Sequence, residues 1–216
     1  KHVIPESFNR GSKIMDSRFR GNDKNMLLAK RIQSVTPSLT LAIEAKAKRL
    51  KQEGIDIISF SAGEPDSDTP TPIKQAAIDA LNKGFTKYTP ASGTVELRKA
   101  ISEKLSRENH LSYSPEQIVV SCGAKHSIYN AIQVLIEKGD EVIIPSPFWL
   151  SYPEMVTLAG GKSIILETSF NEGYLPSPQA LQKLITGKTK VLILNSPSNP
   201  TGAILSKELL KEIIAV

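Results

Sequence analysis

The sequence lacks the features that mark several common protein classes. Cys122 is the single cysteine among 216 residues, which excludes a disulfide framework and a cysteine-based zinc site. No apolar run approaches the roughly 20 residues that a membrane-spanning helix needs. The N-terminal region also has no apolar segment of the kind found in secretory signals. We therefore expect a globular, cytoplasmic protein that does not enter a membrane.

The excess of positive charge is concentrated near the N-terminus. Residues 1–26 hold six basic and three acidic side chains, a net charge of +3, so the other 190 residues carry only +2 of the total of +5. The chain has no basic stripe with interleaved aromatic residues, which proteins that bind single-stranded nucleic acid use. The charge distribution therefore argues against a nucleic-acid partner.

Short apolar runs alternate with amphipathic stretches along the rest of the chain. The spacing predicts helices that follow Ser38, open at Pro72, run through residues 97–105 and 128–138, cover 152–159 and start at Pro178. The β-branched runs predict strands at residues 56–60, 118–120, 142–144, 164–166 and 191–194. This alternation indicates an α/β fold with a mostly parallel sheet and flanking helices.

A polar turn follows the last predicted strand directly. Residues 195–202 read Asn-Ser-Pro-Ser-Asn-Pro-Thr-Gly, a composition that stops a strand and turns the chain sharply. Open α/β sheets bind their ligands at the carboxyl ends of the strands. Asn199 is therefore a candidate ligand-binding residue, whereas Asn195 is expected to hold the turn together.

Two further segments follow predicted strands. Residues 121–127 open a helix, where backbone N–H groups and the helix dipole favour an anion, and Gly123 and Ala124 leave room for one to approach. This segment lacks the glycine patterns of dinucleotide sites and P-loops. Trp149, the only tryptophan, lies in a proline-rich loop and offers a flat stacking surface. Each segment, taken alone, also fits an ordinary turn or core packing.

Together these segments resemble class I aminotransferases, the pyridoxal-phosphate enzymes of fold type I, and most closely the bacterial aspartate aminotransferase branch. Five segments occur in the family's order. They are Gly63-Glu64-Pro65, the Tyr-x-x-x-x-Gly loop from Tyr88 to Gly93, the loop 121–127, the aromatic residue Trp149, and the Asn-x-Pro-x-Asn-Pro-Thr-Gly turn at 195–202. The resemblance runs from about Met26 to the last residue.

The resemblance implies roles for particular residues. Pyridoxal 5'-phosphate would be bound by Gly123, Ala124 and Lys125 at its phosphate, by Trp149 at its ring, by Asn199 at its phenolic oxygen, and by Tyr88 across a dimer interface. The substrate would contact Gly63, Lys125, Trp149 and Asn199. No metal is implied.

The resemblance also implies an activity and its limits. The complete enzyme would be a homodimer that transfers an amino group from aspartate to 2-oxoglutarate, with amino acids and 2-oxo acids as its small-molecule partners. No lysine here lies in the sequence context of the family's Schiff-base lysine, so we expect no catalytic residue within this chain and no activity from it alone. Thr36 replaces the lysine of relatives that accept prephenate, so prephenate is not an expected substrate.

The resemblance sets the expected domain boundaries. Residues 1–25 show no periodicity and are predicted to be a disordered or spurious leader. Residues 26–70 would form an N-terminal arm and a small-domain segment, and residues 71–216 the N-terminal part of the cofactor-binding large domain. The sequence ends within an amphipathic pattern, so this domain is expected to be incomplete at its C-terminus.

Three other interpretations remain open. A different fold type I enzyme, such as an aromatic aminotransferase or a carbon–sulfur lyase, would share these segments. A non-catalytic remnant of a broken gene would share them without the chemistry. A dinucleotide-dependent oxidoreductase is disfavoured because the glycine fingerprint is absent.

Overall fold

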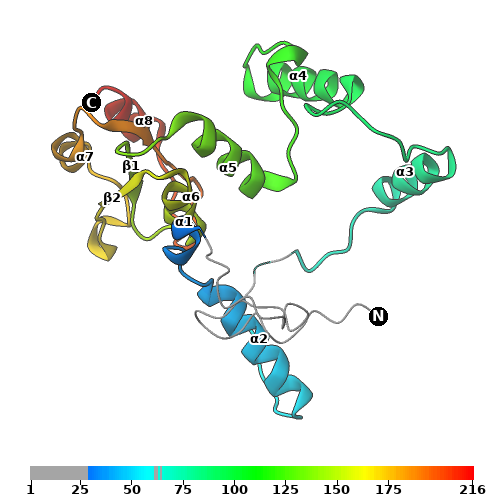
Figure 1. Ribbon diagram of the computed structural model, residues 1–216, viewed down its shortest axis with the longest axis horizontal. Helices are drawn as coiled ribbons and strands as arrows, with labels where there is room; N and C mark the ends of the chain where they lie inside the picture. The colour runs from blue at the N-terminus through cyan, green and yellow to red at the C-terminus, as the bar shows by residue number, and fades with distance from the viewer. Residues whose placement is uncertain (1–28, 61–62, 64) are drawn as a thin grey trace. The chain divides into compact units, whose positions relative to one another are not determined.

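The computed structural model describes residues 29–60, 63 and 65–216, so the expected leader at 1–25 lies outside the described residues. The chain divides into two compact units (Figure 1). We call residues 29–57 and 129–216 the sheet unit, and residues 58–128 the helical unit. Each unit is described by itself.

A parallel sheet forms the centre of the sheet unit. Among the described residues it has three strands in the order β2-β1-β3, with β1 at Glu141–Pro145, β2 at Lys162–Leu166 and β3 at Thr189–Leu192. Both neighbours of β1 run parallel to it. The register shifts once, because Glu141 pairs with Thr189 whereas Val142 pairs with Val191, which leaves Lys190 as an additional residue in β3. The predicted α/β fold with a parallel sheet is confirmed.

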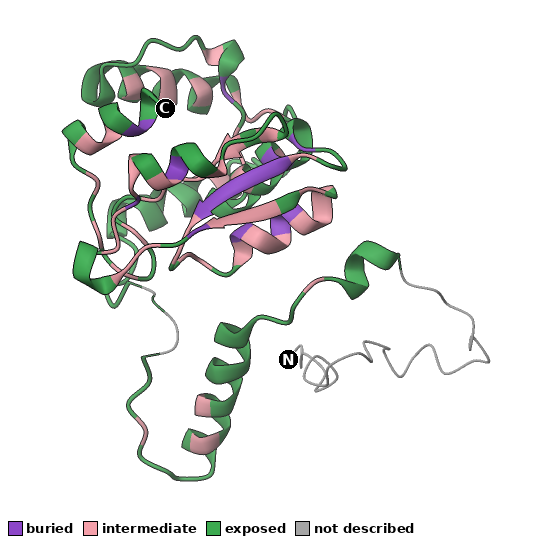
Figure 2. Cartoon of the chain, turned by 90° about the vertical axis from the view of Figure 1, so that its left-hand side faces the viewer, coloured by how far each residue is buried: buried purple, intermediate pink, exposed green. Residues whose placement is uncertain are grey.

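The apolar core lies around the central strand β1. Residues 142–144 are almost completely buried, and neighbouring residues of a strand point to opposite faces, so both faces of β1 are covered. Figure 2 shows this strand as the main buried element of the unit. On one side, Ile143 joins a cluster of buried residues from β2 and two helices; its other members are Leu166, Leu181 and Ile213.

Helices flank the sheet. α6 (Ser151–Ala159) contacts β1 and β2, α7 (Pro178–Leu184) contacts β2, and α8 (Lys207–Ile214) packs against α7. Near the start of the described chain, α1 (Lys30–Gln33) contacts α6, and α2 (Leu39–Gln52) follows it. The short 3-10 helix η4 (Phe170–Glu172) lies in the connection after β2.

The helical unit contains α3 (Thr71–Asn82), α4 (Val95–Asn109), the 3-10 helix η3 (Pro115–Gln117) and the first part of α5 (Gly123–Leu135). Arg98 of α4 connects two of its loops. Its Nη1 donates to the carbonyl of Pro115 at 2.9 Å, and its Nε donates to the carbonyl of Gly93 at 3.2 Å. The loop that ends at Gly93 and the turn at η3 are therefore held against the same helix.

Helix starts follow the sequence signals closely. The Ser38 hydroxyl accepts the N–H of Leu41, and Ser177 accepts that of Ala180 ahead of Pro178, so both predicted starts are confirmed. The helix predicted to open at Pro72 is α3, which begins one residue earlier. Local hydrogen bonding fixes the starts after Ser38 and Ser177, which explains why the sequence alone predicts them.

Two predicted strands are wrong. Residues 56–60 and 118–120 form no strand. The exposed fractions of Ile58 and Phe60 are 82% and 94%, so the first segment packs against no described residue that would bury it. In the second segment, the Val120 N–H donates to the carbonyl of Ser92 at 2.9 Å, but no strand of the described residues pairs with it. An apolar β-branched run becomes a strand only where a partner completes its hydrogen bonds.

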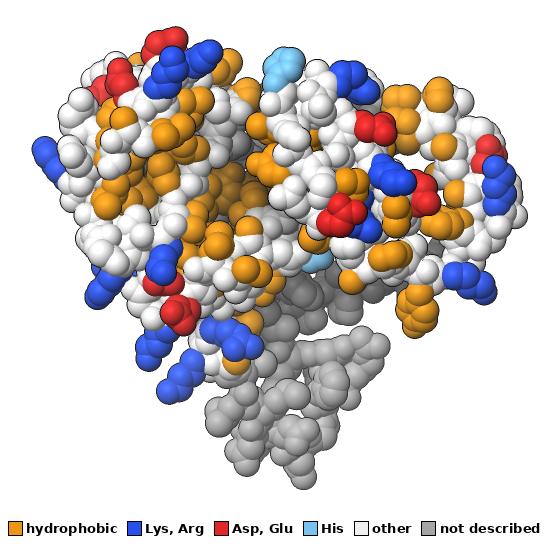
Figure 3. All heavy atoms as spheres, turned by 90° about the horizontal axis from the view of Figure 1, so that it is seen from above, with side chains coloured by type: hydrophobic (Ala, Val, Ile, Leu, Met, Phe, Trp, Pro, Cys, Tyr) orange, Lys and Arg blue, Asp and Glu red, His pale blue; other side chains and the backbone are white. Residues whose placement is uncertain are grey.

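Many large apolar side chains lie at the surface of the described chain. Val134 and Ile214 are examples, and Figure 3 shows such side chains, in orange, over much of one face. The described residues leave these side chains uncovered. Within the part of the chain that the structure describes, no helix has both the length and the apolar character to cross a membrane.

Candidate functional site

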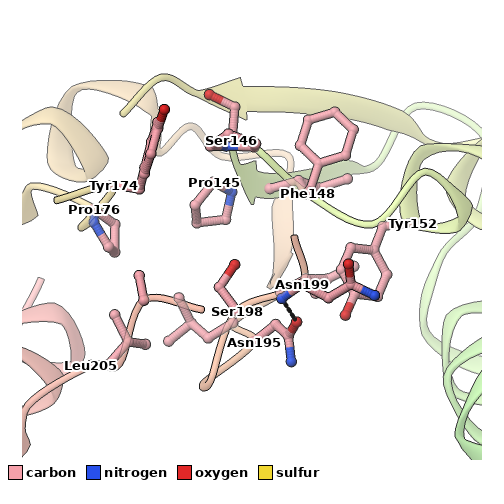
Figure 4. A pocket seen from close by; sticks show the side chains of 15 residues that line it. Pro145, Ser146, Phe148, Tyr152, Tyr174, Pro176, Asn195, Ser198, Asn199 and Leu205 are labelled. Atoms are coloured by element: carbon pink, nitrogen blue, oxygen red, sulfur yellow. Dashed lines mark hydrogen bonds between the residues drawn. The ribbon is translucent and has the colours of Figure 1, made fainter. Parts of the chain in front are cut away.

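A pocket lies where β1 and β3 end. Its walls come from the end of β1 and the loop after it, from the start of α6, from the chain after η4, and from the segment that follows β3 (Figure 4). The cavity volume is about 30 Å³, room for one or two water-sized groups. The lining side chains are mainly apolar or aromatic and include two carboxamides, those of Asn195 and Asn199. The pocket can therefore hold a small polar group or form one wall of a larger site.

The polar turn after β3 is fixed by its own side chains. Asn195 Oδ1 accepts the backbone N–H of Asn199 at 2.7 Å, the bond drawn in Figure 4. Ser196 Oγ accepts the N–H of Leu205 at 3.0 Å, and the Gly202 N–H donates to the carbonyl of Ser198 at 2.7 Å. The predicted role of Asn195 in holding the turn is confirmed. The turn keeps Asn199 at the edge of the pocket.

The loop after β1 places two aromatic residues differently. Phe148 lines the pocket, whereas Trp149 is not among the lining residues. The Trp149 ring meets Tyr152 edge to face, with ring centroids 5.4 Å apart and planes at 88°. Tyr152 is buried and lines the pocket, and burial raises the pKa of its phenol above the ordinary value. Tyr152 therefore stays protonated at neutral pH and can act as a hydrogen-bond donor.

Tyr174 is a pocket residue that the sequence analysis missed. It comes from the segment after β2 and has a left-handed φ of 57°, which is uncommon for a residue other than glycine. Its ring contacts Phe170 edge to face, with centroids 6.1 Å apart. The neighbouring Gly173 gives a signal for the turn, but no local pattern indicates that Tyr174 reaches the ends of β1 and β3.

The predicted phosphate loop lies in the helical unit, at the start of α5. Gly123 has a φ of +82°, and no atom lies within 4 Å of the position that a Cβ would occupy. His126 Nδ1 accepts the N–H of Cys122 at 3.1 Å, so this histidine caps the helix. No sequence pattern named above indicates this cap. The dipole at the start of a helix favours an anion, and Gly123, Ala124 and Lys125 stand at that position in α5. The Gly123 N–H itself donates to the carbonyl of Ser121 at 2.9 Å.

Two further predicted residues also lie in the helical unit. Tyr88 is fully exposed. Gly63 has open space around it, while residues 61, 62 and 64 of its motif lie outside the described residues. The structure thus brings Asn199 together with Phe148 and Tyr152 in one pocket. Of the other predicted residues, Trp149 contacts Tyr152 beside this pocket. Gly63, Tyr88 and residues 123–125 lie in the helical unit.

Comparisons with known proteins identify the family. The family described as aminotransferase class I and II matches residues 55–216. An aspartate aminotransferase of Bacillus sp. (strain YM-2) is 50% identical over 190 residues, which cover 88% of this chain and 48% of that protein. An aspartate/prephenate aminotransferase of Thermus thermophilus is 48% identical over 186 residues, which cover 86% of this chain and 48% of that protein.

Solved structures agree with these matches. The structure of aspartate aminotransferase from Thermus thermophilus with maleate has a TM-score of 0.85 and 47% identity, covering 88% of this chain and 50% of that one. An aspartate aminotransferase from Thermotoga maritima has a TM-score of 0.83 and 40% identity, covering 87% of this chain and 50% of that one. The chain spans about half the length of the curated relatives it matches. On its sequence and its fold alike, this chain belongs to the aminotransferase class I and II family.

Proposed function

We propose that this chain contributes the cofactor-binding part of a pyridoxal-phosphate-dependent aminotransferase of the aspartate/2-oxoglutarate type. The observation that carries the proposal is the turn at 195–202, which is fixed by its own hydrogen bonds and keeps Asn199 beside the pocket at the ends of β1 and β3. Relatives about 50% identical to this chain are named aspartate aminotransferases. The chain spans about half of their length, so the activity is inferred for the complete protein.

The residues present fit pyridoxal 5'-phosphate, which has a flat ring, a phenolic oxygen and a phosphate group. Asn199 offers an amide donor, and Trp149 an aromatic face. The space that a Cβ would fill at Gly123 is open at the start of α5, as an approaching phosphate requires. The pocket itself is too small for the whole ring, so it would form only one wall of the site. When bound, this cofactor acts as an electron sink that makes the substrate Cα–H acidic.

Each residue then has a binding or orienting role. Asn199 donates a hydrogen bond to the phenolic oxygen of the cofactor. The Asn195 side chain keeps Asn199 in place by accepting the Asn199 backbone N–H at 2.7 Å. Residues 123–125, at the positive end of the α5 dipole, bind the phosphate. Lys125 and Gly63 contact the substrate, which is a dicarboxylic amino acid or its 2-oxo acid.

The complete enzyme is further proposed to be a homodimer. Tyr88 supports this, because its side chain is fully exposed and therefore available to a second subunit. In the assembled enzyme Tyr88 would contact the cofactor phosphate of the neighbouring subunit.

The first prediction uses Trp149 as a built-in reporter. Because it is the only tryptophan, adding pyridoxal phosphate to the purified chain is expected to quench its fluorescence as the cofactor ring approaches. Asn199→Ala should weaken this binding about fivefold, the effect of losing one hydrogen bond. Asn171→Ala, which removes an exposed carboxamide outside the pocket, is the control and should bind like the unmodified chain. Absence of quenching in the unmodified chain would overturn the proposed cofactor site.

The same sample tests for chemistry. After borohydride reduction we expect no stoichiometric cofactor adduct on any single lysine, and no aspartate/2-oxoglutarate turnover, because no lysine lies in the required sequence context. One fully modified lysine together with turnover would show that the catalytic lysine lies within these 216 residues.

The second prediction concerns substrate class. In a chimera that joins this chain to the remaining half of the Bacillus sp. relative, Lys125→Ala should reduce kcat/KM for aspartate more than for an apolar amino acid. The expected difference is about 1–3 kcal/mol, the value of a hydrogen bond to a charged group. Lys188→Ala, on an exposed loop before β3, is the control. Equal losses for both amino acids would assign Lys125 to the phosphate or to the fold instead.

A further inference from the structure

A small polar cluster joins the loops that follow β1 and β2. The Ser146 hydroxyl donates to Glu167 Oε2 at 2.7 Å and accepts the backbone N–H of Thr168 at 3.4 Å. The Thr168 hydroxyl donates to the carbonyl of Ser146, and the Ser146 N–H donates to the carbonyl of Leu166 at 2.9 Å. Ser146 is thus tied through its side chain and through both of its backbone groups. We call Ser146, Glu167 and Thr168 the loop clamp.

The loop clamp holds one end of the segment that carries the aromatic residues. This segment leaves β1 at Pro145 and enters α6 at Ser151. Its other end is fixed by the Tyr152 N–H, which donates to the carbonyl of Trp149 at 3.0 Å, and by the edge-to-face contact between the two rings. Only a few residues lie between the two anchors, so releasing one of them frees the position of Phe148 and Trp149.

From these contacts we propose that Ser146 and Glu167 are positioning residues for Trp149. By linking the end of β1 to the end of β2, they fix the loop in which the Trp149 ring is presented for stacking. Glu167 lies on the surface, and its bond to Ser146 spans 21 residues of sequence. A bond in this position is not needed to form either strand, since the ladder between β1 and β2 is complete from Glu141 to Pro145. Its effect is therefore on the loop. The link to cofactor stacking rests on the proposed function, but the positioning of Trp149 does not.

The chain offers a matched control. Ser169 Oγ donates to Glu172 Oε2 at 2.8 Å, which is a second exposed serine–glutamate bond of nearly the same length. It closes η4, and neither of its residues belongs to the loop clamp. Glu172→Ala therefore removes the same type of bond without releasing the Trp149 loop.

The test measures acrylamide quenching and fluorescence anisotropy of Trp149 in the full chain without cofactor. Ser146→Ala and Glu167→Ala are expected to raise the quenching constant about twofold or more and to lower the anisotropy. Glu167→Ala removes one hydrogen bond that restrains the loop, and Ser146→Ala removes two. Glu167→Gln keeps an acceptor oxygen for the Ser146 hydroxyl, so its quenching constant and anisotropy should equal those of the unmodified chain. Glu172→Ala should leave both values unchanged.

Each other outcome has a defined meaning. Unchanged quenching in Glu167→Ala overturns the proposal, and so does an equal rise in Glu172→Ala, which would indicate a general surface effect. If Glu167→Gln behaves like Glu167→Ala, the hydrogen-bond mechanism is wrong. Should Ser146→Ala fail to fold by circular dichroism, Glu167→Ala alone decides, since its side chain is exposed. Pyridoxal phosphate added afterwards separates the two proposals: lack of quenching in the unmodified chain contradicts only the cofactor site.

Discussion

Replacing Ile143 by alanine is expected to lower the free energy of unfolding of the sheet unit by about 2–5 kcal/mol, the range measured for such truncations in closed cores. Ile143 is completely buried at the centre of β1 and meets buried residues from β2, α7 and α8. These neighbours come from several elements that are fixed independently, so the space left by the side chain cannot close fully. Urea unfolding followed by Trp149 fluorescence measures the change, because Trp149 lies in the same unit.

The control for this prediction is Ile214→Ala. Ile214 loses the same atoms when truncated, but its exposed fraction is 81% although the adjacent Ile213 is buried. A change within about 0.5 kcal/mol is expected, as for ordinary surface substitutions. Equal losses at Ile143 and Ile214 would mean that the core does not lie where the structure places it.

Replacing Gly93 by alanine is expected to destabilise the helical unit by about 2–5 kcal/mol, since two penalties combine. Gly93 has a φ of +101°, a backbone conformation that residues with a side chain rarely adopt. A Cβ there would also lie 2.6 Å from Val120 Cγ2 and 2.9 Å from Val120 Cβ. Hydrogen exchange of the amides in α4 and in residues 118–120 measures the local loss of stability.

Gly84→Ala separates the two penalties. Gly84 has a similar positive φ of +76° at the end of α3, but nothing lies within 4 Å of its missing Cβ. This variant should show only the backbone cost, about 1–2 kcal/mol. If both variants lose the same stability, the close approach of Gly93 to Val120 adds no cost to Gly93→Ala.

The sequence predicts the sheet unit better than the helical unit, for a physical reason. Helix starts at Ser38 and Ser177 depend on bonds within a few residues, and β1 and β2 each have a partner of similar length close by in the chain. Residues 56–60 have the composition of a strand but no described partner, so composition alone misleads there. The last strand is displaced as well: β3 begins two residues before the predicted 191–194 and ends at Leu192, although the Ile193 N–H still donates to the carbonyl of Ile143 at 3.0 Å.

The residues of the candidate site also differ in whether the sequence alone predicts them. Asn195 and Asn199 are predictable because one turn contains both the pocket residue Asn199 and the residue that holds it. Phe148, Tyr152 and Tyr174 were not predicted as pocket residues, because they meet the turn only after the strands have paired. His126 was also missed, since capping by a ring nitrogen four residues along the chain follows no common motif.

The additional residue in β3 shows how far the length of this strand can vary. Leu192 and Leu194 both pack against the Ile143 cluster. Thr189 pairs with Glu141 and Val191 with Val142, so deleting the exposed Lys190 would leave one-to-one pairing and keep the later residues on their present face. The path of the chain into Asn195 would then be unchanged. Homologues with and without this residue can therefore share the asparagine turn, with no compensating change in length.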